Sequence, residues 1–182
     1  MRIAHRDNLL LVHDRQWREI ACASEDEAAQ RARVIEEARS WVGCLYRHRG
    51  RVKQGPGEQG GVDCATLLAE VYHRAGVVPY VALEDYSPQW FLNAKEEKYL
   101  SYILPRAQEV AQPKPGDVAL CRFGHSFAHG GIIVDPGWPM IVHAFMAARR
   151  VVCDRGDGGH FGKYRPRFFS AWDDTGAAVL PP

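Results

Sequence analysis

One of the five cysteines in this chain occupies a position that suits a nucleophile. Cys64 directly follows Asp63, a residue type that caps helices, and it opens the apolar-periodic run of residues 64–72. A thiol at a helix N-terminus lies at the positive end of the helix dipole, which favours the nucleophilic thiolate. Its backbone N–H would be an unpaired donor of the first turn and could hold an oxyanion. We therefore predict a nucleophile at Cys64; the alternative is a small buried residue.

Two histidines on apolar strands could supply the base. His129 precedes Gly130 and Gly131, which would allow another element to approach closely, and His143 lies within an apolar strand at residues 141–145. We predict that His129 acts as general base, or as the partner in a thiolate–imidazolium pair. Orienting His129 would give the polar ring of His143 the partner that it needs in an apolar strand. For both histidines the alternative is a hydrogen bond to a backbone carbonyl.

Further residues could assist around these positions. Because the carboxylate of Asp63 opposes thiolate formation, a nearby imidazolium is required to overcome it. Tyr46 could donate to an oxyanion, although a lone tyrosine is more often a packing residue. The basic side chains of the polar loop 47–61, Arg47 and Arg49 among them, could bind substrate carboxylates.

A metal site is the weaker alternative. His125 and His129 are four residues apart, with Cys121, His143, Cys153 and His160 nearby in the sequence. The segment from His125 to His129 reads as a glycine-rich turn and not as a helix, however, and the chain has no Cys-x-x-Cys pair of the kind that structural zinc sites usually contain. We expect no metal and no cofactor, and we expect the other cysteines to be structural: Cys22, Cys44, Cys121 and Cys153.

Helical patterns dominate the first half of the chain. Residues 24–27 read as a capping box that starts a helix closed by Gly43, and the apolar face of that helix is predicted to be Ala28, Ala32, Ile35, Ala38 and Val42. A second helix is predicted from Cys64 to Gly76, with a buried face formed by Ala65, Leu68, Ala69 and Tyr72. A short third helix is expected at 94–103.

Strand patterns dominate the second half, after Pro115-Gly116. The predicted strands are 117–122, 129–135, 140–146, 149–153 and 164–169, and an N-terminal hairpin is predicted from 9–12 and 16–21. Helices followed by strands indicate an α+β domain with an antiparallel sheet. We expect one domain over 1–182, with a catalytic core at about 24–170 and an extension or hairpin at 1–23 whose role stays open.

Composition narrows the possible partners. Lys and Arg total 23 against 22 Asp and Glu, so no basic excess points to nucleic acid. No apolar run approaches the ~20 residues of a membrane span, and the charged N-terminus lacks the apolar stretch of a signal peptide. We therefore expect a protein that is made in the cytoplasm.

Taken together, these motifs resemble the NlpC/P60 family of papain-like cysteine peptidases. The resemblance rests on five segments in order: 43–46, 63–66, 115–117, 129–132 and 143–144. It implies a papain-like fold with N-terminal helices packed on a central antiparallel sheet, and the roles of nucleophile, base and third polar residue for Cys64, His129 and His143. It also implies a peptidoglycan stem-peptide substrate, cut between γ-D-glutamate and the diamino acid. Two departures concern substrate contacts: Ala65-Thr66 replaces the family's Ser-Gly, and the loop 47–60 is longer and more basic.

Segments 61–68 and 128–130 also resemble the phage-tail branch of this family, which implies other tail proteins as partners and a place on the virion. Two alternative functions stay open: a thiol acyltransferase or amidase on the same scaffold, and a non-catalytic tail assembly component. An open cleft with charges beside Cys64 would favour the peptidase, and an apolar tunnel would favour the acyltransferase.

Overall fold

The structure is a computed structural model, and it describes residues 3–6, 9–13, 19–23, 26–53, 59–89, 97–124, 126–158 and 161–179. The helices are α1 (Glu27–Ser40), α2 (Cys64–Arg74) and α3 (Lys98–Ile103), with a 3₁₀ turn η2 (Phe161–Lys163). The strands are β1 (Ile3–Arg6), β2 (Leu9–His13), β3 (Glu19–Ala23), β4 (Arg51–Val52), β5 (Gly61–Val62), β6 (Gln108–Val110), β7 (Val118–Phe123), β8 (Ser126–Ile133), β9 (Met140–Phe145), β10 (Arg150–Arg155) and β11 (Arg167–Ser170).

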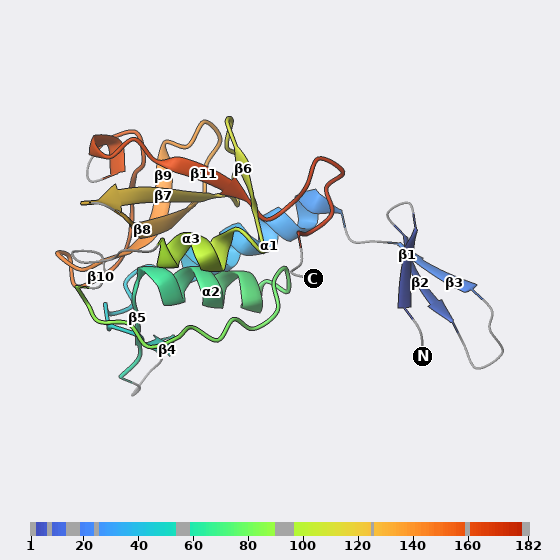
Figure 1. The fold of residues 1–182 in the computed structure, drawn as a ribbon, viewed down its shortest axis with the longest axis horizontal. Helices are drawn as coiled ribbons and strands as arrows, with labels where there is room; N and C mark the ends of the chain where they lie inside the picture. Colours follow the sequence, from blue (N-terminus) through green and yellow to red (C-terminus); the bar gives the residue numbers. More distant parts are fainter. Residues whose placement is uncertain are drawn as a thin grey trace.

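A six-stranded antiparallel sheet forms the centre of the fold, in the order β10-β9-β8-β7-β11-β6. All three helices contact β8, and Figure 1 shows them stacked beside this sheet. The predicted α+β class and antiparallel sheet are therefore confirmed. The edge strand β6 was not predicted, because three residues are too few to show an alternating pattern.

The predicted elements are found with small shifts. α2 begins at Cys64 as predicted, and α3 begins at Lys98, with residues 94–96 of the predicted helix outside the described residues. All five predicted strands of the second half are present. The N-terminal hairpin is confirmed by the antiparallel pairing of β2 with β3, and β1 adds a third strand to a separate small sheet (Figure 1).

The prediction for the first helix was wrong in its cap and only partly right in its face. Asp26, not Ser24, caps α1, because the Asp26 carboxylate accepts a hydrogen bond from the N–H of Ala28. The buried face is formed by Val34, Ala38 and Trp41. Val42 is 46% exposed because the helix ends at Ser40 and the chain turns. Of the predicted face, Ala38 is buried and Ile35 packs against the core, whereas Ala28 and Ala32 are exposed.

α2 is buried along most of its length, which holds Cys64 in a fixed place. Its buried residues go beyond the predicted stripe: Thr66, Leu67, Leu68, Glu70, Val71 and Tyr72. The buried Glu70 carboxylate is paired with Arg51 Nε at 2.8 Å and Arg74 Nε at 3.2 Å, as a buried charge requires. This pairing ties β4 to α2 beside the predicted nucleophile.

Arg31 of α1 connects the helix layer to the sheet. Its guanidinium is 2.8 Å from the buried carboxylate of Asp117, donates to the carbonyl of Pro115 and to the hydroxyl of Ser170, and lies over the ring of Trp172. The Pro115-Gly116-Asp117 turn thus anchors β7 to α1.

We expect Arg31→Ala to lower the free energy of unfolding by about 3–5 kcal/mol, because the substitution leaves the buried Asp117 carboxylate without its cation. Urea unfolding followed by circular dichroism measures this. The matched control is Arg39→Ala in the same helix, whose ion pair with Asp135 is exposed and should contribute about 0–1 kcal/mol. Equal losses in both variants would contradict the assigned role of Arg31.

Candidate active site

Cys64 is the first residue of α2 and lies against the beginning of β8. Its thiol donates to the carbonyl of Ala128 at a sulfur–oxygen distance of 3.7 Å. The backbone N–H of Gly130 also hydrogen-bonds to the sulfur. The two backbone groups at the sulfur, the Ala128 carbonyl and the Gly130 N–H, belong to the residues before and after His129. The predicted nucleophile therefore packs against the segment that carries the predicted base.

Asp63 is the N-cap of α2, as predicted, and its carboxylate is saturated with donors. One oxygen accepts from the N–H groups of Ala65 and Thr66 and from the Thr66 hydroxyl, at 2.9–3.1 Å. The other oxygen accepts from the N–H of Arg49 and the hydroxyl of Tyr86, both at 2.7 Å. The Thr66 hydroxyl in turn accepts from the Asp63 N–H and completes a capping box. Asp63 therefore holds the start of α2 rigidly while it is only 2% exposed.

Two residues around Asp63 were missed in the sequence. His48 lies between two acceptors: Nε2 donates to the Tyr86 carbonyl at 2.8 Å, and Nδ1 is 3.4 Å from the Asp63 carboxylate. The rings of His48 and Tyr86 also meet edge to face. These contacts join the segments 46–50 and 81–87 across the cap of α2. Since the partners are far apart in sequence, no local pattern could have indicated them.

His129 and His143 form the predicted pair. His129 Nε2 and His143 Nδ1 are 3.0 Å apart, and His143 is fully buried. The register Ile132↔Val142 and Ile133↔Ile141 continues to place Gly131 opposite His143. A Cβ on Gly131 would lie 3.0 Å from the Cβ of His143, so the absence of a side chain there makes room for the His143 ring. The predicted reason for the glycines is thereby confirmed at Gly131.

Aromatic rings surround this histidine pair. Phe161 of η2 lies 5.0 Å from His129 and 4.9 Å from His143, measured between ring centroids. The Phe123 ring also stacks on the His129 ring, with 5.6 Å between the ring centroids, and the Tyr164 ring packs edge-on against Phe123. Both imidazoles are buried, and a hydrogen bond between them is stronger in such a low-dielectric setting than in water.

Cys64 and His129 line one cavity of about 670 Å³. Its wall is rich in aromatic and small residues and includes Tyr46, as the sequence suggested: Tyr46, His48, Asp63, Ala65, Tyr86, Ser87, Pro88, Tyr99, Phe123, Gly124, Ala128, Ala144, Phe145, Met146, Ala147 and Tyr164. The part of its lining that the structure describes does not include Arg47 or Arg49. The Arg47 side chain donates to the Gln59 carbonyl, and that of Arg49 pairs with Asp85. Arg49 contacts the site only through its backbone N–H, which donates to the Asp63 carboxylate.

Burial changes the electrostatics expected for Cys64. Burial, and then the charge of Asp63, raise the pKa of the Cys64 thiol to about 12, while hydrogen bonds from Gly130 N–H and the Tyr99 hydroxyl act in the opposite direction. A helix dipole contributes only about 0.3–1 kcal/mol, less than about one pKa unit. The helix dipole is thus outweighed by burial and by Asp63, in line with the expectation that Asp63 opposes the thiolate, and a base must take the proton. Tyr46 has its pKa raised by burial, Cys64 and Asp63, so it keeps its proton and can donate.

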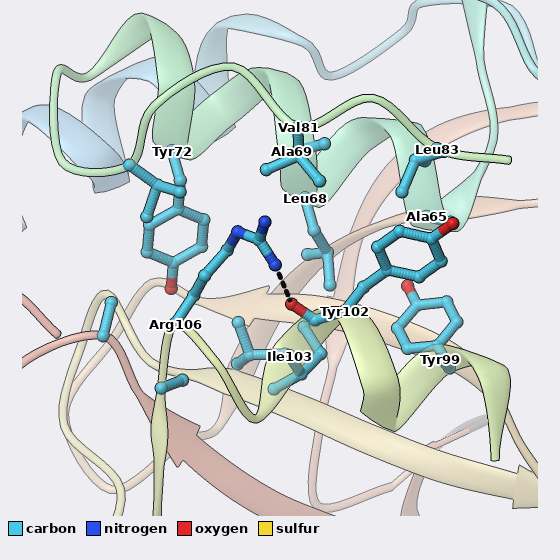
Figure 2. Close-up of a pocket in the computed structure, with 14 residues that line it drawn as sticks. Ala65, Leu68, Ala69, Tyr72, Val81, Leu83, Tyr99, Tyr102, Ile103 and Arg106 are labelled. Atoms are coloured by element: carbon cyan, nitrogen blue, oxygen red, sulfur yellow. Dashed lines mark hydrogen bonds between the residues drawn. The ribbon is translucent and has the colours of Figure 1, made fainter. Parts of the chain in front are cut away.

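A second, smaller cavity of about 80 Å³ lies behind this site, between α2, α3 and residues 78–83 (Figure 2). Its lining is apolar apart from three tyrosines and Arg106, whose guanidinium donates to the Tyr102 carbonyl. Ala65 and Tyr99 line both cavities. The two spaces are thus neighbours on either side of Tyr99.

The other cysteines whose side chains the structure describes form no disulfide and are absent from the described lining of the cavity. Cys44 and Cys121 are buried, and Cys153 is half-buried. The side chain of Cys22 lies outside the described part of the structure, so its predicted structural role stays a prediction. No group of three or more potential metal ligands occurs among the residues that the structure describes. Within the same part of the chain, no helix is long and apolar enough to span a membrane.

Comparisons with known proteins agree with this architecture. No protein-family model and no curated protein matches the chain. Among solved structures, it is similar to the peptidoglycan hydrolase RipB of Mycobacterium tuberculosis, with 20% identity, a TM-score of 0.52, and coverage of 79% of this chain and 65% of that one. It is also similar to an NLP/P60-family lipoprotein-like protein of Staphylococcus aureus, with 18% identity, a TM-score of 0.51, and coverage of 87% of this chain and 43% of that one. An NlpC/P60 family protein of Bacillus cereus has 16% identity, a TM-score of 0.50, and coverage of 98% of this chain and 52% of that one.

A helix-borne cysteine packed beside an antiparallel sheet that carries two histidines defines a papain-like α+β fold. The structural neighbours identify it more closely: the chain has the NlpC/P60 fold, as the motifs in its sequence suggested. It spans less than two thirds of the length of each of these three neighbours.

Proposed function

We propose that the protein is a cysteine peptidase that hydrolyses amide bonds in peptidoglycan stem peptides, between γ-D-glutamate and the diamino acid. The observation that carries this proposal is the cavity that joins Cys64 to the hydrogen-bonded pair His129–His143. A volume of about 670 Å³ accommodates a short peptide. Hydroxyl side chains in its lining, those of Tyr46 and Ser87 among them, suit an amide substrate better than a purely apolar one.

In the proposed mechanism, His129 takes the Cys64 proton and the sulfur attacks the scissile carbonyl carbon. His129 Nε2 is bonded to His143, so Nδ1 is the ring atom that exchanges this proton. The Nε2–H of the imidazolium donates to Nδ1 of a neutral His143, which stabilises the charged form. The Cys64 N–H and the Tyr46 hydroxyl hold the oxyanion. The imidazolium then gives its proton to the leaving amine, and water, deprotonated by His129, hydrolyses the thioester.

The test is incubation of purified muropeptides with the protein, followed by mass spectrometry of the products. Cleavage at the proposed bond releases two fragments whose masses add up to the muropeptide plus one water. The control is protein whose thiols have been blocked with iodoacetamide. Unchanged muropeptide masses after incubation with the untreated protein would contradict the proposal.

A second candidate is a thiol amidase or acyltransferase on the same scaffold. One observation favours it: the apolar cavity behind Tyr99 could take an alkyl group close to the nucleophile (Figure 2). The volume of about 80 Å³ limits that group to a few carbon atoms. Hydrolysis of short-chain thioesters or esters with no cleavage of muropeptides would favour this candidate over the peptidase.

We also propose, from the resemblance of segments 61–68 and 128–130, that the protein is made in the cytoplasm and assembles with phage or prophage tail proteins. Sedimentation of particles from an induced culture, with detection of the protein by mass spectrometry, tests this. Its recovery only in the non-sedimenting fraction would favour a cellular role for the same hydrolase. A non-catalytic tail component would instead sediment and leave muropeptides intact.

A further inference from the structure

Tyr99 of α3 contacts the predicted nucleophile, Cys64. Its hydroxyl donates to the backbone carbonyl of Cys64 at 3.0 Å, and the residue is only 7% exposed. Figure 2 shows the Tyr99 hydroxyl directed from α3 toward the beginning of α2, near Ala65. The ring forms part of the wall of both cavities. Tyr99 is thus the residue of α3 that contacts the nucleophile.

The structure makes room for this hydroxyl at Gly130. A Cβ on Gly130 would lie 2.8 Å from the Tyr99 hydroxyl oxygen and 3.0 Å from Leu68 Cδ1. Any side chain there would push the hydroxyl away from Cys64. Gly130 therefore has two roles. Its N–H hydrogen-bonds to the Cys64 sulfur, and because it has no side chain, the Tyr99 hydroxyl can lie next to it.

The Tyr99 hydroxyl is also a permanent donor. Burial, and then the neighbouring Cys64 and Asp63, raise the pKa of Tyr99 well above its usual value, so the phenol keeps its proton. A hydrogen bond from Tyr99 to the Cys64 side chain lowers the pKa of the thiol, against the larger effect of burial. The hydroxyl is thus bonded to the Cys64 carbonyl at 3.0 Å and also influences the pKa of the neighbouring thiol.

We propose that Tyr99 is a catalytic residue that donates a hydrogen bond to the Cys64 sulfur when the thiol proton passes to His129. The proposal rests on Cys64 being the nucleophile of the proposed function. In this step the S–H bond breaks, the proton moves to His129, and Tyr99 keeps its own proton while its O–H turns from the Cys64 carbonyl to the thiolate. Together with the Gly130 N–H, Tyr99 would replace the solvation that the thiolate loses on burial.

The test is Tyr99→Phe, which keeps the ring and removes only the hydroxyl. The rate constant for alkylation of Cys64 by iodoacetamide is measured against pH, with modification at position 64 quantified by peptide mass spectrometry. Since a hydrogen bond to a charged group stabilises it by an amount equivalent to roughly 10- to 100-fold, we expect alkylation at neutral pH to slow by that factor. The other titratable groups around the thiol are unchanged in this variant: His48, Asp63, Tyr46, Tyr86 and His129.

Ser101→Ala is the matched control, because it also removes a hydroxyl from α3 but from an exposed side chain. We expect wild-type alkylation in that control, and a fall in kcat with little change in KM for Tyr99→Phe on any substrate that the enzyme cleaves. Alkylation of Tyr99→Phe as fast as, or faster than, that of the wild type would overturn the proposal. Because alkylation needs no peptidoglycan, this result is independent of whether muropeptides are cleaved.

A second variant is expected to change the alkylation rate in the opposite direction. Incorporation of 3-fluorotyrosine at position 99 makes the phenol a stronger donor, and we expect alkylation at neutral pH to become faster. A residue that only packs against α2 would slow or disturb the reaction in both variants. An unchanged or slower rate with 3-fluorotyrosine would contradict the donor role even if Tyr99→Phe failed to fold.

Discussion

Replacement of Cys64 by alanine is expected to lower kcat on the muropeptide substrate by about 10⁴-fold or more, because the proposed covalent intermediate forms on the Cys64 sulfur. Cys64 is the cysteine that lines the cavity with His129, among the residues that the structure describes. The small side chain of alanine keeps the cap of α2, which depends on Asp63 and not on the sulfur. KM should change little, since the thiol contributes little to ground-state binding. The measurement is initial-rate kinetics with separation of the product peptides.

Cys153→Ala is the matched control for this substitution. Cys153 is a free and half-buried thiol on β10, and it is absent from the described lining of the cavity. Its replacement should leave kcat unchanged. If Cys64→Ala cleaved muropeptides as fast as Cys153→Ala, the thiol could not be the nucleophile, and the proposed peptidase mechanism would be wrong.

The second large effect is expected for His129→Gln. Loss of a positioned general acid–base group should lower kcat by about 10²- to 10⁴-fold. The same variant should also change how Cys64 titrates. Burial and Asp63 raise the pKa of the Cys64 thiol to about 12, so thiolate forms at neutral pH only when a base takes the proton. We expect His129 to take that proton in the wild type, and alkylation of His129→Gln at neutral pH to be slower and to rise only at higher pH.

His73→Gln provides the matched control, because His73 lies exposed near the end of α2 and packs only on its surface, against Tyr80. It should retain the alkylation profile and the kcat of the wild type. Fast alkylation of His129→Gln at neutral pH would show that another group forms the thiolate. In that case the role of base would have to be assigned to a different residue of the cavity.

The sequence predicted the groups that depend on their immediate neighbours. Asp63 as cap, Cys64 as first helical residue and the strands around His129 and His143 are each specified within about one turn of helix or one short strand. The predicted fold class and papain-like architecture agree with the structure for the same reason. Periodicity was only partly right at α1: Ala38 is buried as predicted, but Val34 and Trp41 complete the buried face, and Ala28 and Ala32 are exposed.

Basic residues of the loop 47–61 were expected to bind substrate, and their contacts show why composition alone could not decide this. Arg51 is paired with the buried Glu70, and Lys53 with Glu37, so both charges serve the fold. Arg49 contributes its backbone N–H to Asp63. The sequence shows that a side chain is positively charged. Which carboxylate it pairs with depends on the residues that the fold places next to it.

By itself, then, the sequence determined the chemistry that is available: a thiol at a helix start, two imidazoles on neighbouring strands, and glycines that let these elements approach. Only the tertiary structure decided the surroundings of that thiol. Tyr99 lies 35 positions from Cys64, and Tyr86 lies 23 positions from Asp63. The burial that raises the pKa of Cys64 comes from all the packed elements together. Capping and periodicity act within a few residues, but desolvation and hydrogen bonds across elements exist only after the chain has folded.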